Sequence, residues 1–192
     1  MRKIIASTYA TLDGYIDNPH LWMMQYGTEE AQKYSFDLLM GSDAVLMGRV
    51  TYEGMAQAWP ERGGDPFADK ANSMAKYVVT STLEKADWNN TTIIPGNDVV
   101  AAVTELKRQP GDDILIWGCG RLTDTLMEHG LLDEYRISVY PVIKGEGQRL
   151  FREGIEATLE LTDTTVFGQG VVLTYRPLSA GGDEDGAAPA AG

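Results

Sequence analysis

The stretch AVLMGRVTY (residues 44–52) decides how this chain folds. Four apolar residues are followed by Gly48 and Arg49 and then by helix-forming residues, so a buried strand is expected to lead directly into a helix. A second stretch, ILIWGCGRL (residues 114–122), breaks in the same way at glycine and arginine. The free backbone N–H groups and the dipole at the start of a helix favour a bound phosphate. Two such junctions suit a dinucleotide, which has two ends to be held.

The composition is typical of a globular protein with one domain. The chain has 192 residues, 43% of them hydrophobic, which is enough for one full-sized core but short of two ordinary domains. The net charge of -12 argues against nucleic-acid and anionic-membrane binding, because both depend on clustered Lys and Arg. A single cysteine, with no signal-peptide or membrane-spanning pattern, predicts a cytoplasmic protein. The cysteine and the two histidines show no ligand-like spacing, so no metal site is expected.

Hydrophobic periodicity and turn residues predict alternating strands and helices, followed by strands alone. Strands are expected at residues 2–9, 43–47, 76–81, 91–94, 113–117 and 135–140, and helices at 29–40, 49–59, 98–109 and 121–129. Residues 61–69 are expected to form a surface loop, and residues 158–167 and 171–176 a closing hairpin. This order predicts an α/β fold with a mainly parallel sheet, helices on both faces and an antiparallel C-terminal hairpin. The domain is expected to span residues 1–177, followed by a disordered acidic Gly/Ala-rich tail at 178–192.

Three turns are predicted to meet at one edge of this sheet. In an open parallel sheet, ligands bind beyond the carboxyl ends of the strands, where the two glycine–arginine junctions and the Thr80-Ser81-Thr82 turn would lie. Glycine allows the backbone to approach a ligand closely, hydroxyl groups donate to phosphate oxygens, and arginine offers a matching fork. The sequence therefore predicts a phosphate-binding edge.

Each of these residues also has a simpler interpretation. A glycine at a strand-to-helix junction is about as often a plain turn residue, and the Thr-Ser-Thr run is explained equally well as a turn cap. The arginines are equally consistent with ordinary surface charges. Cys119 is favoured as a small packed residue over a nucleophile, and Trp22 and Trp59 as packing residues over substrate-stacking ones.

The sequence resembles the dihydrofolate reductase superfamily, and within it the RibD C-terminal family, the reductase domain of a riboflavin-biosynthesis deaminase-reductase. The resemblance runs from about residue 3 to residue 176. It is carried by the segments TLDGYI (11–16), VLMGRVTY (45–52), YVVTST (77–82), IWGCGRL (116–122) and GLLDEYRISVYPVI (130–143), the last followed by Gly145-x-Gly147 and Leu150-Phe151.

The resemblance implies an NADPH-dependent reductase acting on a small polar or heterocyclic substrate, such as 5-amino-6-(5-phosphoribosylamino)uracil. The cofactor-binding residues that it implies are Gly48, Arg49, Thr51, Thr80, Ser81, Gly118, Cys119, Gly120, Arg121 and Leu122. The substrate-side residues are Thr11, Gly14, Trp22, Trp59 and Ser138. Asp13 or a water molecule would supply the proton that accompanies hydride transfer.

Two other functions stay open at this stage. The sequence shows no dedicated general acid, so a non-catalytic nucleotide- or partner-binding module of the same fold is the main alternative. Dihydrofolate reductases carry an acid 16 positions before the glycine of the Gly-Arg motif, where this chain has Gln32, so folate reduction is the least favoured. The family resemblance also implies a homodimer formed through the C-terminal strands.

Overall fold

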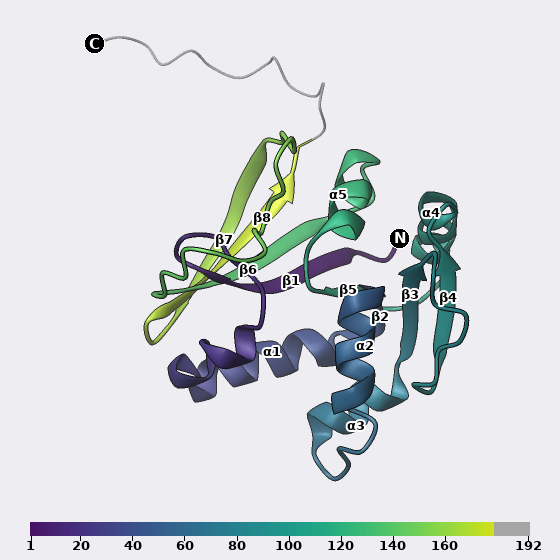
Figure 1. The fold of residues 1–192 in the computed structure, drawn as a ribbon, viewed down its shortest axis with the longest axis horizontal. Coiled ribbons are helices and arrows are strands. Elements are labelled where there is room, and N and C mark those ends of the chain that lie inside the picture. The colour runs from purple at the N-terminus through teal and green to yellow at the C-terminus, as the bar shows by residue number, and fades with distance from the viewer. Residues whose placement is uncertain (179–192) are drawn as a thin grey trace.

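The computed structural model describes residues 1–178 as one eight-stranded sheet flanked by helices (Figure 1). The strands are β1 (Ile4–Thr11), β2 (Ser42–Gly48), β3 (Ala75–Thr80), β4 (Thr91–Pro95), β5 (Asp113–Trp117), β6 (Glu134–Tyr140), β7 (Leu159–Phe167) and β8 (Gly170–Pro177). The helices are α1 (Glu29–Met40), α2 (Arg49–Ala58), α3 (Pro66–Ser73), α4 (Val99–Arg108) and α5 (Arg121–Glu128), with short 3-10 helices η1 (Pro19–Leu21) and η2 (Met24–Tyr26). The expected tail lies outside the described residues, except for Leu178.

The strand order is β4-β3-β2-β5-β1-β6-β8-β7. The first six of these strands are parallel, while β8 runs antiparallel to both β6 and β7. This is the α/β fold with a closing antiparallel hairpin that the sequence predicts.

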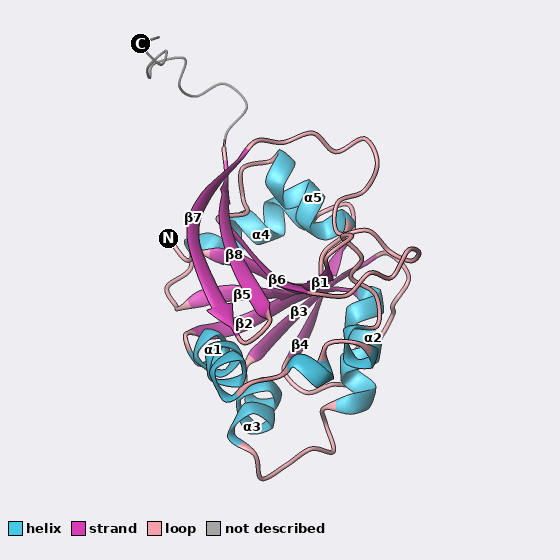
Figure 2. Cartoon of the chain, turned by 90° about the vertical axis from the view of Figure 1, so that its left-hand side faces the viewer, coloured by secondary structure: helices cyan, strands magenta, loops and turns pink. Residues whose placement is uncertain are grey.

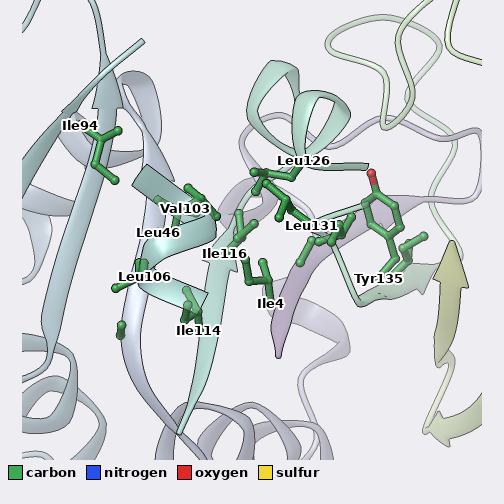
Figure 3. Packing of buried hydrophobic residues seen from close by; sticks show 14 of the residues in the cluster. Ile4, Leu46, Ile94, Val103, Leu106, Ile114, Ile116, Leu126, Leu131 and Tyr135 are labelled. Atoms are coloured by element: carbon green, nitrogen blue, oxygen red, sulfur yellow. The ribbon is translucent and has the colours of Figure 1, made fainter. Parts of the chain in front are cut away.

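Helices pack on both faces of the sheet (Figure 2). On one face, α4 and α5 bury a cluster that includes Leu46, Val103 and Leu126 (Figure 3). On the other face, α1, α2 and α3 bury a second cluster that includes Leu39 and Tyr52. The central strands are apolar on both faces for this reason, and their sequences are nearly continuous apolar runs. No helix of residues 1–178 has the length and apolar character needed to cross a bilayer.

Two expected boundaries are confirmed to the residue. Helix α1 begins after Thr28, whose Oγ1 accepts a hydrogen bond from the backbone N–H of Ala31 at 3.2 Å, and it ends before Gly41. Strand β5 occupies the expected residues between the Pro110-Gly111 turn and the second glycine junction.

Two expectations were wrong. The predicted loop at 61–69 contains the start of α3, because the side chain of Asp65 caps this helix by accepting from the N–H of Phe67 at 2.9 Å and Pro66 occupies its first turn. The first strand also runs further than predicted. Thr11 pairs with Tyr140 of β6 and is the last residue of β1 rather than part of the following loop.

Candidate functional site

The parallel strands end along one edge of the sheet, which we call the carboxyl edge. Gly48 at the end of β2 is in register with Val79 of β3, and Trp117 at the end of β5 is in register with Ser7 of β1. The turns that follow these strands therefore lie beside one another, as the sequence predicts.

The two glycine–arginine junctions are in direct contact. Gly118 has φ of +80°, and a Cβ placed on it would lie 3.0 Å from Oγ1 of Thr51 in the first turn of α2. The glycine turn (residues 118–120) is thus packed against the start of α2. A side chain at position 118 would be strained by its backbone conformation and would occupy the space between the two junctions.

The start of α2 is open to an anion. Its N-cap residue, Gly48, makes no side-chain capping hydrogen bond, no acid lies in the first turn, and a Cβ at Gly48 would meet no atom within 4 Å. The backbone N–H groups and the dipole of α2 are therefore available to a phosphate.

The start of α5 is organised differently. Oγ1 of Thr123 accepts from the N–H of Gly120 at 3.0 Å and donates to its carbonyl at 2.9 Å, which fixes the glycine turn. The one acid in this first turn, Asp124, is buried and accepts a hydrogen bond from Nε of Arg152 at 2.5 Å, so its charge is balanced. Of the two helix starts, that of α2 is therefore the more open, while that of α5 is fixed by its own side chains.

The two arginines differ in their partners. Nη1 of Arg49 donates to both carboxylate oxygens of Glu53 at 2.9 Å, one turn further along α2. Arg121 is exposed at the start of α5 and makes no ion pair within residues 1–178. A bound phosphate would meet Arg121 directly but would share Arg49 with Glu53.

The hydroxyl groups after β3 also differ. Oγ1 of the buried Thr80 accepts from the N–H groups of Thr82 at 3.1 Å and Leu83 at 3.0 Å, which is the turn-capping role considered from the sequence. Ser81 is exposed, and its Oγ lies directly against Gly96 in the turn after β4. Ser81 is therefore the more accessible hydroxyl group.

Two of the implied cofactor residues direct their side chains into the protein. Cys119 and Leu122 pack against the core cluster below α5, and burial raises the pKa of the Cys119 thiol to about 12. The thiol is neutral at physiological pH, so these residues can contribute their backbone to a ligand but not a thiolate.

Asp13 is a structural anion in this structure. One carboxylate oxygen accepts from Oγ1 of Thr11 at 2.6 Å, and the carboxylate also accepts from the N–H groups of Lys144 at 3.0 Å and Gly145 at 2.8 Å. The hydrogen bond from Thr11 and these backbone bonds lower the pKa of Asp13 to about 2. Its carboxylate is thus ionised at neutral pH and holds the first loop (residues 12–18) to the segment that follows β6.

That segment, the β6–β7 connection (residues 141–158), contributes to the site and carries residues that sequence reasoning missed. Lys144 forms an ion pair with Asp17, and the N–H of Gln148 donates to the same carboxylate at 2.8 Å. The side chain of Gln148 also reaches the glycine turn, where Nε2 donates to the carbonyl of Cys119 at 3.2 Å. The sequence offered the Gly145-x-Gly147 motif here but not its partner in the fold, and a Cβ at Gly147 would collide with Asp17.

The substrate-side residues form two aromatic groups rather than one. Trp22 is buried, donates from Nε1 to the carbonyl of Asp17 at 3.1 Å and lies edge-on to Tyr140, with 6.2 Å between ring centroids. Trp59 packs instead on Phe67 and Trp117, at centroid distances of 5.3 and 6.3 Å. Both tryptophans therefore pack on other aromatic side chains, and their place on the substrate side stays a prediction.

Ser138 lies on the strand beside Tyr9, with which it is in register, at the face of the sheet that α1 covers. Tyr9 and Tyr26 also flank the ring of Tyr140, at centroid distances of 6.1 and 5.9 Å. The aromatic group around Tyr140 was missed because Tyr9 and Tyr140 alternate along strands in the way that core residues do, while Tyr26 lies in the short helix η2. Gly14, with φ of +82°, lies in the turn beyond β1.

A hollow of about 380 Å³ opens at the opposite end of the sheet, between Lys3, Glu134 and Arg176. Its cations are neutralised, because Lys3 pairs with Glu134 at 2.7 Å and Arg176 pairs with Glu160. This hollow is remote from the carboxyl edge and plays no part in the site.

The fold and the carboxyl edge define a class of protein: an α/β fold with a mainly parallel sheet, in which the starts of α2 and α5 meet at one edge. Residues 2–173 match the family model of the RibD C-terminal domain, and the chain belongs to this family. YyaP of Bacillus subtilis (strain 168) is 32% identical over 177 residues, which cover 89% of this chain and 92% of YyaP.

Solved structures show the same fold. A protein of Shewanella sp. PV-4 assigned to riboflavin biosynthesis aligns with a TM-score of 0.70 and 20% identity, covering 92% of this chain and 99% of that one. Dihydrofolate reductase from Enterococcus faecalis, complexed with NADP(H), aligns with a TM-score of 0.57 and 12% identity, covering 92% and 97%. The resemblance and the dihydrofolate reductase-like fold inferred from the sequence are both confirmed.

Proposed function

We propose that this chain is an NADPH-dependent reductase that transfers hydride to a small polar or heterocyclic substrate. The observation that carries the proposal is the contact between Gly118 and Thr51, which brings an open helix start and a glycine turn together at one sheet edge. Membership of the RibD C-terminal family supports a reductase, and the likeness to a dihydrofolate reductase complexed with NADP(H) supports the cofactor.

Different residues along the carboxyl edge would bind different parts of the cofactor. NADPH, when bound, supplies the hydride. The first turn of α2, the glycine turn and Arg121 would hold its phosphates, since these groups offer N–H donors and an unbalanced positive charge. The first loop would lie beside the reacting end, because Gln148 ties the segment packed on that loop to the glycine turn.

Proton supply places fewer demands on the protein than hydride transfer does. Asp13 is ionised and its carboxylate is engaged by three donors, so it is poorly suited to release a proton at neutral pH. Of the two sources that the sequence leaves open, we therefore favour a water molecule. Hydride transfer mainly requires that the donor carbon be held against an electrophilic centre, so no dedicated acid is needed.

Calorimetric titration with NADPH and NADH, followed by turnover with a substrate panel, tests this proposal. The panel contains 5-amino-6-(5-phosphoribosylamino)uracil, dihydrofolate and simple heterocyclic imines, and oxidation of the cofactor is followed by absorbance. Failure of both dinucleotides to bind at millimolar concentration would refute the cofactor assignment. Tight binding without turnover of any panel member would favour the alternative, a non-catalytic nucleotide-binding module.

We also propose that the chain forms a homodimer through its C-terminal strands. Strand β7 is the edge strand of the sheet, and its residues are mostly exposed, including Leu161 and Val166 at 52% and 68%. Long exposed edge strands are prone to pair with another chain. Light scattering that gives the mass of one chain at micromolar concentration would refute this assembly.

A further inference from the structure

The first turn of α2 directs two functional side chains to different sides. Residues two apart on an α-helix point in nearly opposite directions, and Thr51 faces the glycine turn after β5. Arg49 therefore lies on the β3 side of the helix. Tyr52, which shares a helix face with Arg49, agrees with this placement, because its hydroxyl oxygen accepts from the N–H of Trp88 in the β3–β4 connection at 3.0 Å.

Arg49 and Ser81 thus border the same end of the carboxyl edge. Gly48 and Val79 are in register, so the chain leaves β2 and β3 side by side, and Ser81 follows immediately. Phosphates held by the glycine turn and by α2 would lie between this end and the first loop beyond β1, because the strand order is β3-β2-β5-β1. With the reacting ring beside the first loop, the adenosine half of a dinucleotide would extend toward Arg49. That half carries the 2′-phosphate, the group that distinguishes NADPH from NADH.

The positive charge at this end is already balanced. Nη1 of Arg49 lies 2.9 Å from each carboxylate oxygen of Glu53, with both side chains a little under half exposed. The other cation nearby, Lys85, forms an ion pair with Asp87. Residues 80–98 contain three acids and this one base, so they supply no spare cation to a phosphate.

We propose that Glu53 sets the cofactor preference of this chain by engaging Arg49 and thereby weakening selection for NADPH over NADH. The inference rests on the proposed function, since it concerns the adenosine end of the same dinucleotide. A 2′-phosphate would have to displace the Glu53 carboxylate from Arg49 or lie close to it, and either would weaken binding. NADH has no 2′-phosphate, so its binding would not be weakened in this way. Removing one negative charge at contact distance in water changes a dissociation constant about fivefold, and more for a doubly charged phosphate.

The test is titration of NADPH and NADH against the wild type and Glu53→Gln, with Asp37→Asn as the matched control. Asp37 forms an exposed ion pair with Lys33, also spaced i,i+4, but on α1 near the amino end of β5. We expect Glu53→Gln to lower the Kd for NADPH about fivefold to tenfold and to leave the Kd for NADH within twofold. Asp37→Asn should change neither value.

A second substitution makes the test graded. Glu53→Lys should favour NADPH further. The gain from Glu53→Gln should be smaller in an Arg49→Ala background, because the competition for the guanidinium is then gone and only the direct repulsion between carboxylate and phosphate remains. An unchanged NADPH to NADH ratio in Glu53→Gln, or equal tightening for both dinucleotides, would overturn this inference and leave the proposed function standing. Failure of the wild type to bind either dinucleotide would refute the proposed function, and this inference with it.

Discussion

Lys76 is an unusual residue whose protonation should be visible in the stability of the protein. Its side chain is fully buried at the beginning of β3, where Nζ donates to the carbonyls of Asn72 at 2.9 Å and Met74 at 2.8 Å. The ring of Trp88 lies 4.6 Å from Nζ. No carboxylate pairs with this ammonium group within residues 1–178, so one carbonyl of the last turn of α3, the carbonyl of the following residue and one aromatic ring are its partners.

Burial lowers the pKa of Lys76 from its ordinary value of 10.5 to about 8. In the unfolded chain the amine keeps its proton up to the ordinary value, while in the folded protein it loses the proton near pH 8. Between these two values the unfolded state binds more protons, so the free energy of unfolding rises with pH in this window. A pKa difference of this size corresponds to a change of about 3 kcal/mol in the free energy of unfolding over the whole window.

The perturbation that isolates this effect is Lys76→Met, which keeps the length of the side chain and removes the titrating group. Urea unfolding of both proteins at intervals from pH 7 to pH 11 gives the free energy of unfolding at each pH. We expect the wild-type value minus the variant value to rise with pH, by up to about 3 kcal/mol. Subtraction removes the tyrosines and all other groups that titrate in both proteins.

The opposite outcome has a clear physical meaning. If the two carbonyls and the Trp88 ring stabilise the ammonium more than burial penalises it, the pKa of Lys76 would exceed its ordinary value. The difference between the proteins would then fall as the pH rises through the folded pKa. A flat or falling difference would therefore refute the reasoning from desolvation.

Three further predictions concern the carboxyl edge. Gln148→Glu should speed amide exchange in both the first loop and the glycine turn, because a carboxylate cannot donate to the Cys119 carbonyl that Nε2 now contacts. Hydrogen exchange followed by mass spectrometry measures this, and unchanged exchange in the glycine turn would contradict the link. Asp13→Asn should loosen the first loop but leave the pH profile of NADPH oxidation unchanged across the neutral range, because the Asp13 pKa is about 2. If the wild-type rate fell as the pH rose and this fall were lost in Asp13→Asn, Asp13 would instead be the proton donor. Gly118→Ala should cost about 1–2 kcal/mol in unfolding free energy and weaken dinucleotide binding, since φ is +80° and the added Cβ would press on Thr51. The control Gly54→Ala, in helix α2 with open space around the added Cβ, should stabilise the protein by up to about 1 kcal/mol without affecting binding.

The sequence predicted elements best where a local signal marked both ends. Helix α1 has Thr28 as a hydrogen-bonded N-cap and Gly41 after its last turn, and both could be identified in advance. Helix α3 has an equally local start in Asp65 and Pro66, but its short polar sequence lies within a Gly- and Asp-rich stretch typical of a loop. The capping signal was present, but the loop-like composition around it was given more weight.

The β6–β7 connection is a different case, because its role depends on contacts between distant parts of the chain. Lys144 bonds to Asp13 and pairs with Asp17, and these partners are separated by 131 and 127 residues. No periodicity or turn signal in a single sequence encodes such pairs. The opposite charges become informative only when β1 and β6 are known to be neighbours in the sheet.

The two halves of the candidate site differ in predictability for a related reason. The residues that we propose for phosphate binding lie at strand ends, where glycine and arginine interrupt an apolar run and so are conspicuous in the sequence. The residues on the other side, Tyr9, Ser138 and Tyr140, lie within strands, where every second residue faces the same way. An aromatic side chain at such a position follows the same alternation whether it meets a substrate or the core, and Tyr140 is buried against other rings in this structure. Interruptions in the pattern of such a sequence can therefore point to a candidate ligand-binding edge, whereas both the ligand and the substrate must be identified by experiment.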